Sequence, residues 1–148
     1  MSGRILGVDL GERRIGLALS DELGLTAQGL DVLQHRDDDR SLAALAQIAC
    51  AHQAGTIVFG LPRNMDGSMG PMAKKVAAFG DRLKELLPEH TVTYWDERLT
   101  TTAAQRMLVE ADLSRARRRQ VVDKVAAVLI LQGYMDGLRN RDEAQKRS

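Results

Sequence analysis

Two short apolar runs separated by only three residues open the chain and restrict how it can fold. Arg4–Leu10 and Arg14–Ser20 are rich in Ile, Leu and Val, and Gly11, Glu12 and Arg13 join them. A connection of this length that contains glycine is typical of a tight β-hairpin. The sequence therefore predicts a sheet that begins with two antiparallel strands.

Beyond this hairpin, apolar patterns of strand and helix period alternate along the chain. The sequence predicts a strand at Leu30–His35, a helix from Asp37 to about Ala54, a strand at Thr56–Phe59, a loop at Gly60–Gly70, a helix from Pro71, a strand at Val92–Trp95, a helix at Thr100–Ala111 and a helix from Val121 to about Leu138. Gly55 is expected to end the first helix. This order predicts an α/β fold with a mixed five-stranded sheet, antiparallel strands first and parallel strands after, flanked by helices. The first strand is expected near the middle of that sheet.

Length and composition predict one globular domain over residues 1–148. Of these residues 44% are hydrophobic and 28% are charged, which is ordinary for a folded domain. The basic tail at 139–148 is expected to fray. A single cysteine excludes an intramolecular disulfide, and the residues up to Val8 are too few for a secretory signal. We therefore expect a cytoplasmic protein without a membrane segment.

Carboxylates follow two of the predicted strands, and another begins the last helix. Asp9 ends a strand that should be covered on both faces, and Asp96 and Glu97 follow the strand Val92–Trp95. Strand alternation should bring only one of those two beside Asp9, and the residues themselves do not say which. Asp123 lies in the first turn of a helix that is otherwise apolar nearly all round, so its side chain is expected to point inward.

Three acids at one end of a sheet would repel one another unless a cation lay between them. Oxygen ligands without nearby cysteine or histidine suit Mg²⁺ or Mn²⁺. One or two such ions can promote hydrolysis of a phosphodiester. Each acid also has an ordinary structural explanation: a turn cap for Asp9, a surface ion pair for Asp96 or Glu97, and a favourable charge at a helix start for Asp123.

Positive charge is concentrated beside these acids, although the formal net charge of the whole chain is only +1. Between residues 98 and 124 seven basic and three acidic residues leave a net charge of +4. The basic residues are Arg98, Arg106, Arg115, Arg117, Arg118, Arg119 and Lys124. Such a strip could hold a phosphate backbone, although a solvated basic loop would explain it as well. Aromatic residues are only 3% of the chain, so base stacking should contribute little.

Four segments in this order resemble the YqgF/RuvX family of bacterial RNase H-like nucleases, which comprises Holliday junction resolvases and pre-16S rRNA nucleases. They are ILGVDLGERRIGLALSD at Ile5–Asp21, IVFGLPRNMDGSMG at Ile57–Gly70, DERLTTTAA at Asp96–Ala104 and VVDKVAAVLILQGYMD at Val121–Asp136. The resemblance implies an RNase H-like fold that binds divalent metal. Matched motif by motif, it assigns Asp9, Glu97 and Asp123 as the catalytic and metal-binding set, and so prefers Glu97 to Asp96.

The resemblance also favours nucleic acid as the substrate. We expect the following residues to contact it: Arg14, Asn64, Arg98, Arg115, Arg117, Arg118, Arg119 and Lys124. Arg14 matches a family arginine for which a phosphate contact is our hypothesis, and the loop at Gly60–Gly70 matches a family motif without a chemical role that we can assign.

The leading hypothesis is a metal-dependent nuclease, and the family resemblance alone favours maturation of the 5′ end of pre-16S rRNA as its role. One alternative is a resolvase of Holliday junctions or other branched DNA, and a non-catalytic RNA-binding assembly factor is another. A symmetric junction would favour a homodimer, whereas trimming one strand needs only a monomer. An ATP-binding fold of the actin and Hsp70 kind would need a duplicated domain and a second phosphate loop, and the sequence contains neither.

Overall fold

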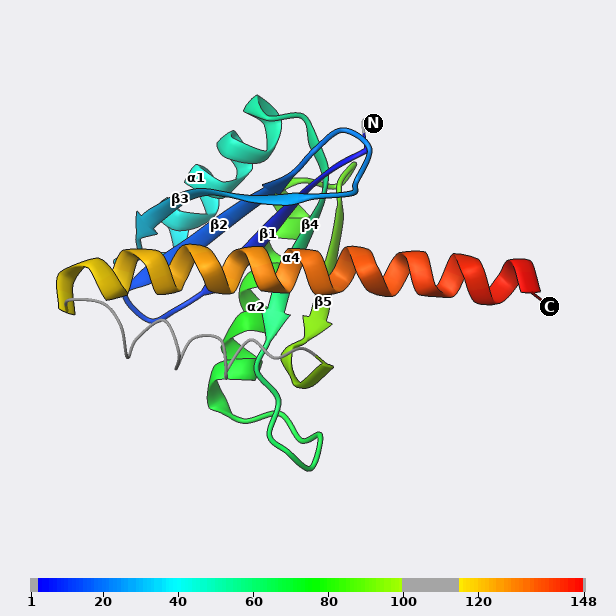
Figure 1. The fold of residues 1–148 in the computed structure, drawn as a ribbon. Helices are drawn as coiled ribbons and strands as arrows, with labels where there is room; N and C mark the ends of the chain where they lie inside the picture. Colours follow the sequence, from blue (N-terminus) through cyan, green and yellow to red (C-terminus); the bar gives the residue numbers. More distant parts are fainter. Residues whose placement is uncertain (1–2, 100–114, 148) are drawn as a thin grey trace.

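The computed structural model describes the backbone of residues 3–99 and 115–147, and the side chains of residues 3–99 and 124–141. Within these ranges five strands form one mixed sheet in the order β3-β2-β1-β4-β5 (Figure 1). The strands are β1 (Arg4–Leu10), β2 (Arg14–Ser20), β3 (Ala27–Gln34), β4 (Ala54–Leu61) and β5 (Thr91–Asp96). β1, β2 and β3 are antiparallel, whereas β4 runs parallel to β1 and to β5. The predicted mixed sheet with a central first strand is therefore confirmed.

The opening hairpin forms where the sequence predicts it. Leu10 pairs with Ile15, and the backbone N–H of Gly11 donates to the carbonyl oxygen of Arg14 at 2.9 Å. A Cβ at Gly11 would lie only 2.7 Å from that same oxygen, which explains why the turn needs glycine.

Helix α1 (Asp38–Ala51) begins as predicted but ends earlier than expected. The side chain of Asp37 accepts a hydrogen bond from the N–H of Asp39 and so caps the first turn. The prediction that Gly55 ends this helix is wrong. Gln53 takes the left-handed conformation after the helix, with φ of 57°, and Gly55 lies inside β4 where the register against β1 is irregular.

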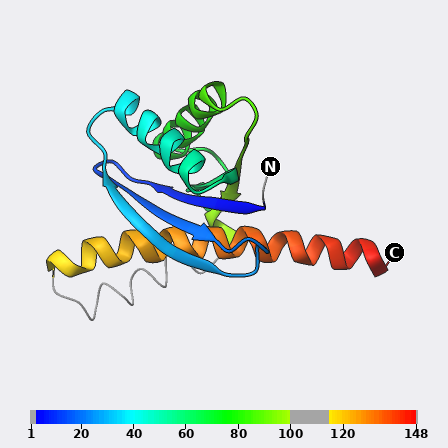
Figure 2. The same cartoon turned by 90° about the horizontal axis from the view of Figure 1, so that it is seen from above.

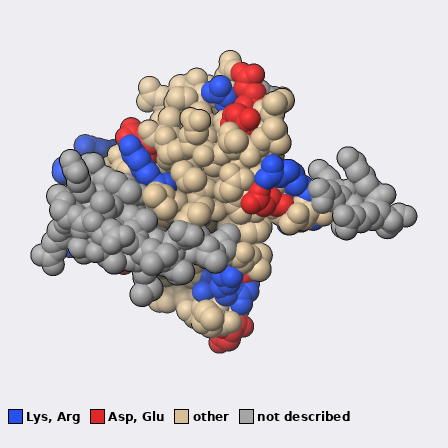
Figure 3. All heavy atoms as spheres, in the orientation of Figure 1, with Lys and Arg blue, Asp and Glu red and all other residues tan. Residues whose placement is uncertain are grey.

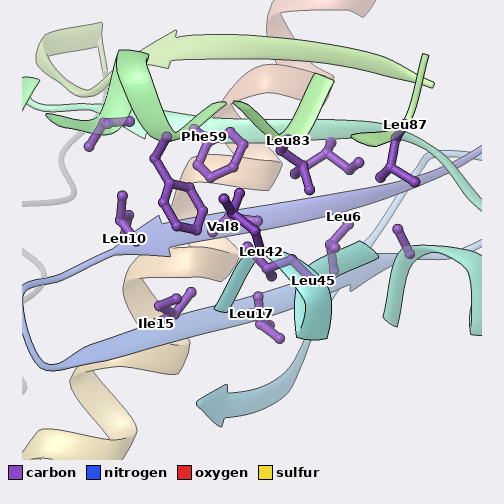
Figure 4. Packing of buried hydrophobic residues seen from close by; sticks show 14 of the residues in the cluster. Leu6, Val8, Leu10, Ile15, Leu17, Leu42, Leu45, Phe59, Leu83 and Leu87 are labelled. Carbon is purple, nitrogen blue, oxygen red and sulfur yellow. The ribbon is translucent and has the colours of Figure 1, made fainter. Parts of the chain in front are cut away.

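Helices cover both faces of the sheet (Figure 2). α1 and α2 (Pro71–Leu86) lie on one face, which we call the α1/α2 face, and α4 (Arg115–Arg147) lies on the other, the α4 face. Side chains from β1 and β4, such as Val8 and Phe59, pack with Leu42 and Leu83 in the core of the α1/α2 face (Figure 4). Pro71 occupies the first turn of α2, where its missing N–H costs no hydrogen bond.

α4 is longer than predicted at both ends. The basic run at 115–119 forms its first turns rather than a loop, and residues 139–147, which the sequence suggests will fray, continue the helix to Arg147. The short helix expected at Thr100–Ala111 lies outside the described residues. The 3-10 turn η1 (Glu97–Leu99) directly follows β5.

α4 packs very close to the sheet at Gly7. A Cβ there would lie 2.7 Å from the Cβ of Leu131 and 3.1 Å from the carbonyl oxygen of Ala127, so only glycine allows this approach. None of the helices in the described part of the chain has the length and apolarity that crossing a membrane requires.

Candidate functional site

Three neighbouring strands bring Asp9 and Glu97 to one edge of the sheet. β4 lies between β1 and β5 and is parallel to both, so all three end at the same edge. Phe59 of β4 pairs with Val8 of β1 and with Tyr94 of β5. These three paired residues form one row across the sheet. Asp9 is the residue after this row in β1, and Glu97 directly follows the last residue of β5. Carboxyl ends of parallel strands are where α/β folds commonly bind ligands.

Both acids lie on the α4 face of the sheet. Asp9 is two residues beyond Gly7, which packs under α4, so strand alternation places Asp9 on that face too. Gly60 locates the second carboxylate directly. A Cβ added there would lie 2.9 Å from Oε1 of Glu97 and 2.4 Å from Cδ1 of Ile130. The Glu97 carboxylate thus lies over Gly60, beneath α4, and its Oε1 atom is buried.

Asp96 lies on the opposite side of β5 and has a different partner. It shares the strand face of Tyr94, which packs against the α1/α2 core. The guanidinium of Arg98 donates to both of its carboxylate oxygens, from Nε at 3.1 Å and from Nη2 at 2.7 Å. Hydrogen bonds from the Arg98 side chain lower the pKa of Asp96 below its ordinary value of 3.8. Alternation therefore separates these neighbouring acids, and Glu97 is the one on the face of Asp9.

The third acid of the predicted set, Asp123, belongs to α4, but its side chain lies outside the described residues. Ala127 and Ile130, which follow it on the helix, are fully buried against the sheet. Among the described side chains, no three His, Cys, Asp or Glu residues lie close enough together to hold a metal ion. The described side chains of the predicted set are thus Asp9 and Glu97, and each could offer a metal ion only carboxylate oxygens as ligands.

The predicted nucleic-acid contacts do not all lie at this edge of the sheet. Arg14 begins β2 at the same edge, two residues from Gly16, which pairs with Asp9. Lys124 is exposed on α4 and lies over Gly29 of β3. The remaining basic residues of this group form the first turns of α4, and their side chains lie outside the described residues: Arg115, Arg117, Arg118 and Arg119.

The loop from Pro62 to Gly70 projects beyond the edge of the sheet, and charged atoms gather on it (Figures 1 and 3). Asn64, a predicted nucleic-acid contact, uses its side-chain amide to bond Ser68 at 2.9 Å. Arg98, another such residue, donates from Nη1 to the carbonyl oxygen of Met65 at 3.3 Å. In the structure both side chains therefore brace this loop.

Sequence reasoning missed Gly60 and Arg63. Gly60 is the position over which Glu97 lies, and a glycine closing a buried strand before a loop was the available signal of close approach. Arg63 donates to the carbonyl oxygen of Gly67 at 3.2 Å, a contact without a sequence signal.

A cavity of about 500 Å³ lies on the α1/α2 face, at the end of β1 that carries Asp9 but across the sheet from the carboxylate pair. Its lining includes Leu10, His35, Phe79 and Arg82. Since Glu97 lies on the α4 face, this cavity does not contain the candidate site.

Comparison with known proteins gives a family and a fold. A family model described as "RuvX: Holliday junction resolvase" matches residues 3–137. A protein of Clostridium botulinum (strain Hall) named "Putative pre-16S rRNA nuclease" is 50% identical over 135 residues, which covers 91% of this chain and 98% of that protein. A protein of the same name from Clostridium kluyveri (strain NBRC 12016) is 48% identical over 133 residues, or 90% of this chain and 96% of that protein.

Among solved structures, T. thermophilus RuvC in complex with a Holliday junction substrate superposes with a TM-score of 0.56 at 12% identity, covering 88% of this chain and 93% of that one. The fowlpox virus Holliday junction resolvase gives a TM-score of 0.56 at 13% identity, with 92% and 99% covered. At such low identity these matches show the fold alone, and that fold is RNase H-like.

Proposed function

This chain belongs to the RuvX family of Holliday junction resolvases, and on that premise we propose that it is a divalent-metal-dependent nuclease that hydrolyses phosphodiester bonds. One observation supports the proposal most directly. The carboxylate of Glu97 lies over Gly60 on the face and edge of the sheet that Asp9 also occupies. Two acids that are far apart in the sequence thus share one end of three parallel strands.

The donor set suits a divalent cation. Asp9 and Glu97 offer only carboxylate oxygens, and Mg²⁺ and Mn²⁺ prefer oxygen ligands. The bare Gly60 leaves room on the sheet for Glu97 where any larger residue would collide with it. Asp123 completes the set, because helical spacing puts it on the same side of α4 as Ala127.

In this proposal the three acids hold one or two ions. A bound ion would supply Lewis acidity that activates water and offsets charge on the phosphate. The protein's own basic residues then hold and orient the strand: Arg14 at the edge beside Asp9, and the first turns of α4 with Lys124 along the phosphate backbone.

Precursor 16S rRNA is the substrate that we propose first. The names of the relatives at about 50% identity support it, since they match over nearly their whole length. Action on such a substrate also supports a cytoplasmic location. The family description favours a four-way DNA junction as the second candidate, and in that case a homodimer would match the symmetry of the junction.

A cleavage panel tests this proposal. A pre-16S rRNA leader, a four-way junction and single-stranded DNA are incubated with the protein at fixed salt with Mg²⁺ or Mn²⁺. We expect cleavage of the rRNA leader that Asp9→Asn and Glu97→Gln each reduce by about 10³-fold or more, because each removes a ligand without changing side-chain size.

Glu85→Gln, on the exposed surface of α2, is the matched control and should cleave like the parent. Equal cleavage by Asp9→Asn and the parent under the same metal would show that the site is wrongly assigned. Binding of the leader without cleavage under any metal would favour a non-catalytic RNA-binding factor instead.

A further inference from the structure

The loop that leaves the candidate site carries the most exposed of the large apolar side chains in the described part of the chain. Met65, midway along the loop from Pro62 to Gly70, is 92% exposed. This loop begins two residues after Gly60, over which Glu97 lies, and it extends past the edge of the sheet (Figure 1). Single exposed apolar residues are common on protein surfaces, so exposure alone means little. What sets Met65 apart is how it is held.

Hydrogen bonds within the loop fix its shape. The N–H of Asn64 donates to the carbonyl oxygen of Ser68 at 3.0 Å, and the N–H of Gly67 donates to that of Asn64 at 2.8 Å. Asp66 accepts from both the N–H and the hydroxyl of Ser68, at 2.9 and 2.6 Å. Gly67 has a φ of 89°, a left-handed conformation that glycine adopts without strain. Met65 is therefore presented on an ordered turn.

Arg98 ties this turn to the strand that carries the candidate site. Its guanidinium binds the carboxylate of Asp96, and its Nη1 atom also donates to the carbonyl oxygen of Met65. Asp96 directly precedes Glu97 in the chain. The Arg98 side chain thus connects the backbone of Met65 to Asp96, the residue that precedes Glu97.

We propose that Met65 is a wedge that inserts between two bases next to the bond to be cut, an inference that rests on the proposed nuclease function. Methionine is among the apolar residues that enter base steps in kinked nucleic acids, and its flexible thioether adapts to either purine or pyrimidine faces. Arg63, exposed on the same turn, is placed to contact the adjoining phosphate. The favoured substrate is therefore one with an easily unstacked step at the cut.

Fluorescence of 2-aminopurine, which rises when the base is unstacked, tests the wedge without cleavage. The probe is placed on either side of the cut in the rRNA leader and at the centre of the four-way junction, and the protein carries Asp9→Asn so that the substrate stays intact. We expect emission to rise on binding with Met65 or Met65→Leu, and to stay at the free-substrate level with Met65→Ala. Leu86→Ala, an exposed apolar residue of α2, is the matched control and should keep the rise.

In the same set of variants, the loss of Met65 should affect the affinity for nucleic acid less than it affects the cleavage rate. Met65→Ala should weaken binding by less than about tenfold, because phosphate contacts supply most of the affinity. With Asp9 intact, it should lower the cleavage rate at saturating substrate by about ten- to a hundredfold through poorer positioning. Arg63→Ala should instead reduce the dependence of log K on log salt by about 0.7 to 0.9.

An equal rise in emission with Met65→Ala and with the parent would overturn the wedge. Its failure and that of the proposed function are distinguishable. If no nucleic acid is cleaved but emission from the probe at the junction centre still depends on Met65, then Met65 separates bases without a cleavage role and the nuclease assignment falls. If cleavage depends on Asp9 while emission never changes, the nuclease assignment stands and the wedge falls.

Discussion

Gly60 is the residue at which the backbone of the sheet meets both α4 and the candidate carboxylate. A Cβ at this position would lie 2.4 Å from Ile130 and 2.9 Å from Oε1 of Glu97. Gly60→Ala should therefore lower the free energy of unfolding by about 1–3 kcal/mol through overpacking, and it should lower cleavage as well because Glu97 must move. Urea unfolding and cleavage rates measured on the same preparation check both effects.

Gly29→Ala is the control for this substitution, since a Cβ there would meet only Lys124 at an ordinary 3.5 Å. It should change the free energy of unfolding by less than about 0.5 kcal/mol. Equal stability of Gly60→Ala and the parent would contradict the close approach of α4 to β4.

The ion pair between Asp96 and Arg98 predicts a stability that depends on pH. The Arg98 side chain holds the pKa of Asp96 below 3.8, so the folded state favours the ionised carboxylate. This contribution is present above the unfolded pKa and is lost as the pH falls through the folded one. The stability difference between the parent and Asp96→Asn should therefore shrink below about pH 4. Urea unfolding at a series of pH values measures it, and a constant difference would refute the assignment.

At the scale of elements, Tyr94 joins β5 to α2. The single proton of its hydroxyl is shared between two acceptors, the carbonyl oxygen of Ala77 at 3.0 Å and Oδ1 of Asp81 at 3.1 Å. Burial, and then the hydrogen bond with Asp81, raises the pKa of Tyr94 to about 12. A raised pKa favours the neutral phenol in the folded state, so its contribution is complete below pH of about 10 and is lost as the pH rises toward the folded value.

Tyr94→Phe should lower the free energy of unfolding by about 0.5–1.5 kcal/mol at neutral pH. The gap between variant and parent should narrow above pH of about 10, where the parent alone ionises. Thermal unfolding from neutral to alkaline pH tests both statements. A gap that widens with pH would show that the phenol is not stabilised in its neutral form.

The sequence predicts element order and type well, because apolar period and turn chemistry are local properties. It fails at boundaries that tertiary contacts decide. Gly55 looks like a helix stop, yet it lies in a strand whose register against β1 is irregular, which no local signal shows. The basic run at 115–119 looks like a loop, yet it continues a helix that Ala127 and Ile130 anchor to the sheet.

The candidate site is partly predictable for the same reason. Asp9 and the pair Asp96 and Glu97 follow recognisable strands, so their edge could be derived. Which of the pair faces Asp9 depends on where β5 ends and on the space that Gly60 leaves, and spacing alone leaves that open. The hydrogen bonds by which Asn64 and Arg98 brace the loop exist only once the loop is folded, so they could not be predicted from the sequence.

At the scale of the whole molecule, the first turns of α4 and the edge with Asp9 belong to one face. Replacing Arg117, Arg118 and Arg119 together by alanine should weaken nucleic-acid binding, with the slope of log K against log salt reduced by about 2 to 3. Lys74, Lys75 and Lys84, on α2 across the sheet, give a matched triple-alanine control that should leave this slope unchanged. Binding titrations over a range of salt decide between these outcomes, and equal slopes for the two triples would contradict a binding face on the α4 side.

Because α1 and α2 pack on one face of the sheet while Asp9 and Glu97 lie on the other, substitutions can change the stability of the fold without touching these two acids. To raise the free energy of unfolding of this protein by design, the core around Leu45 and Leu83 can be repacked while the residues on the α4 face are kept unchanged. Selection in nature has the same freedom, so substitutions that compensate for losses near Glu97 should accumulate on the far side of the sheet.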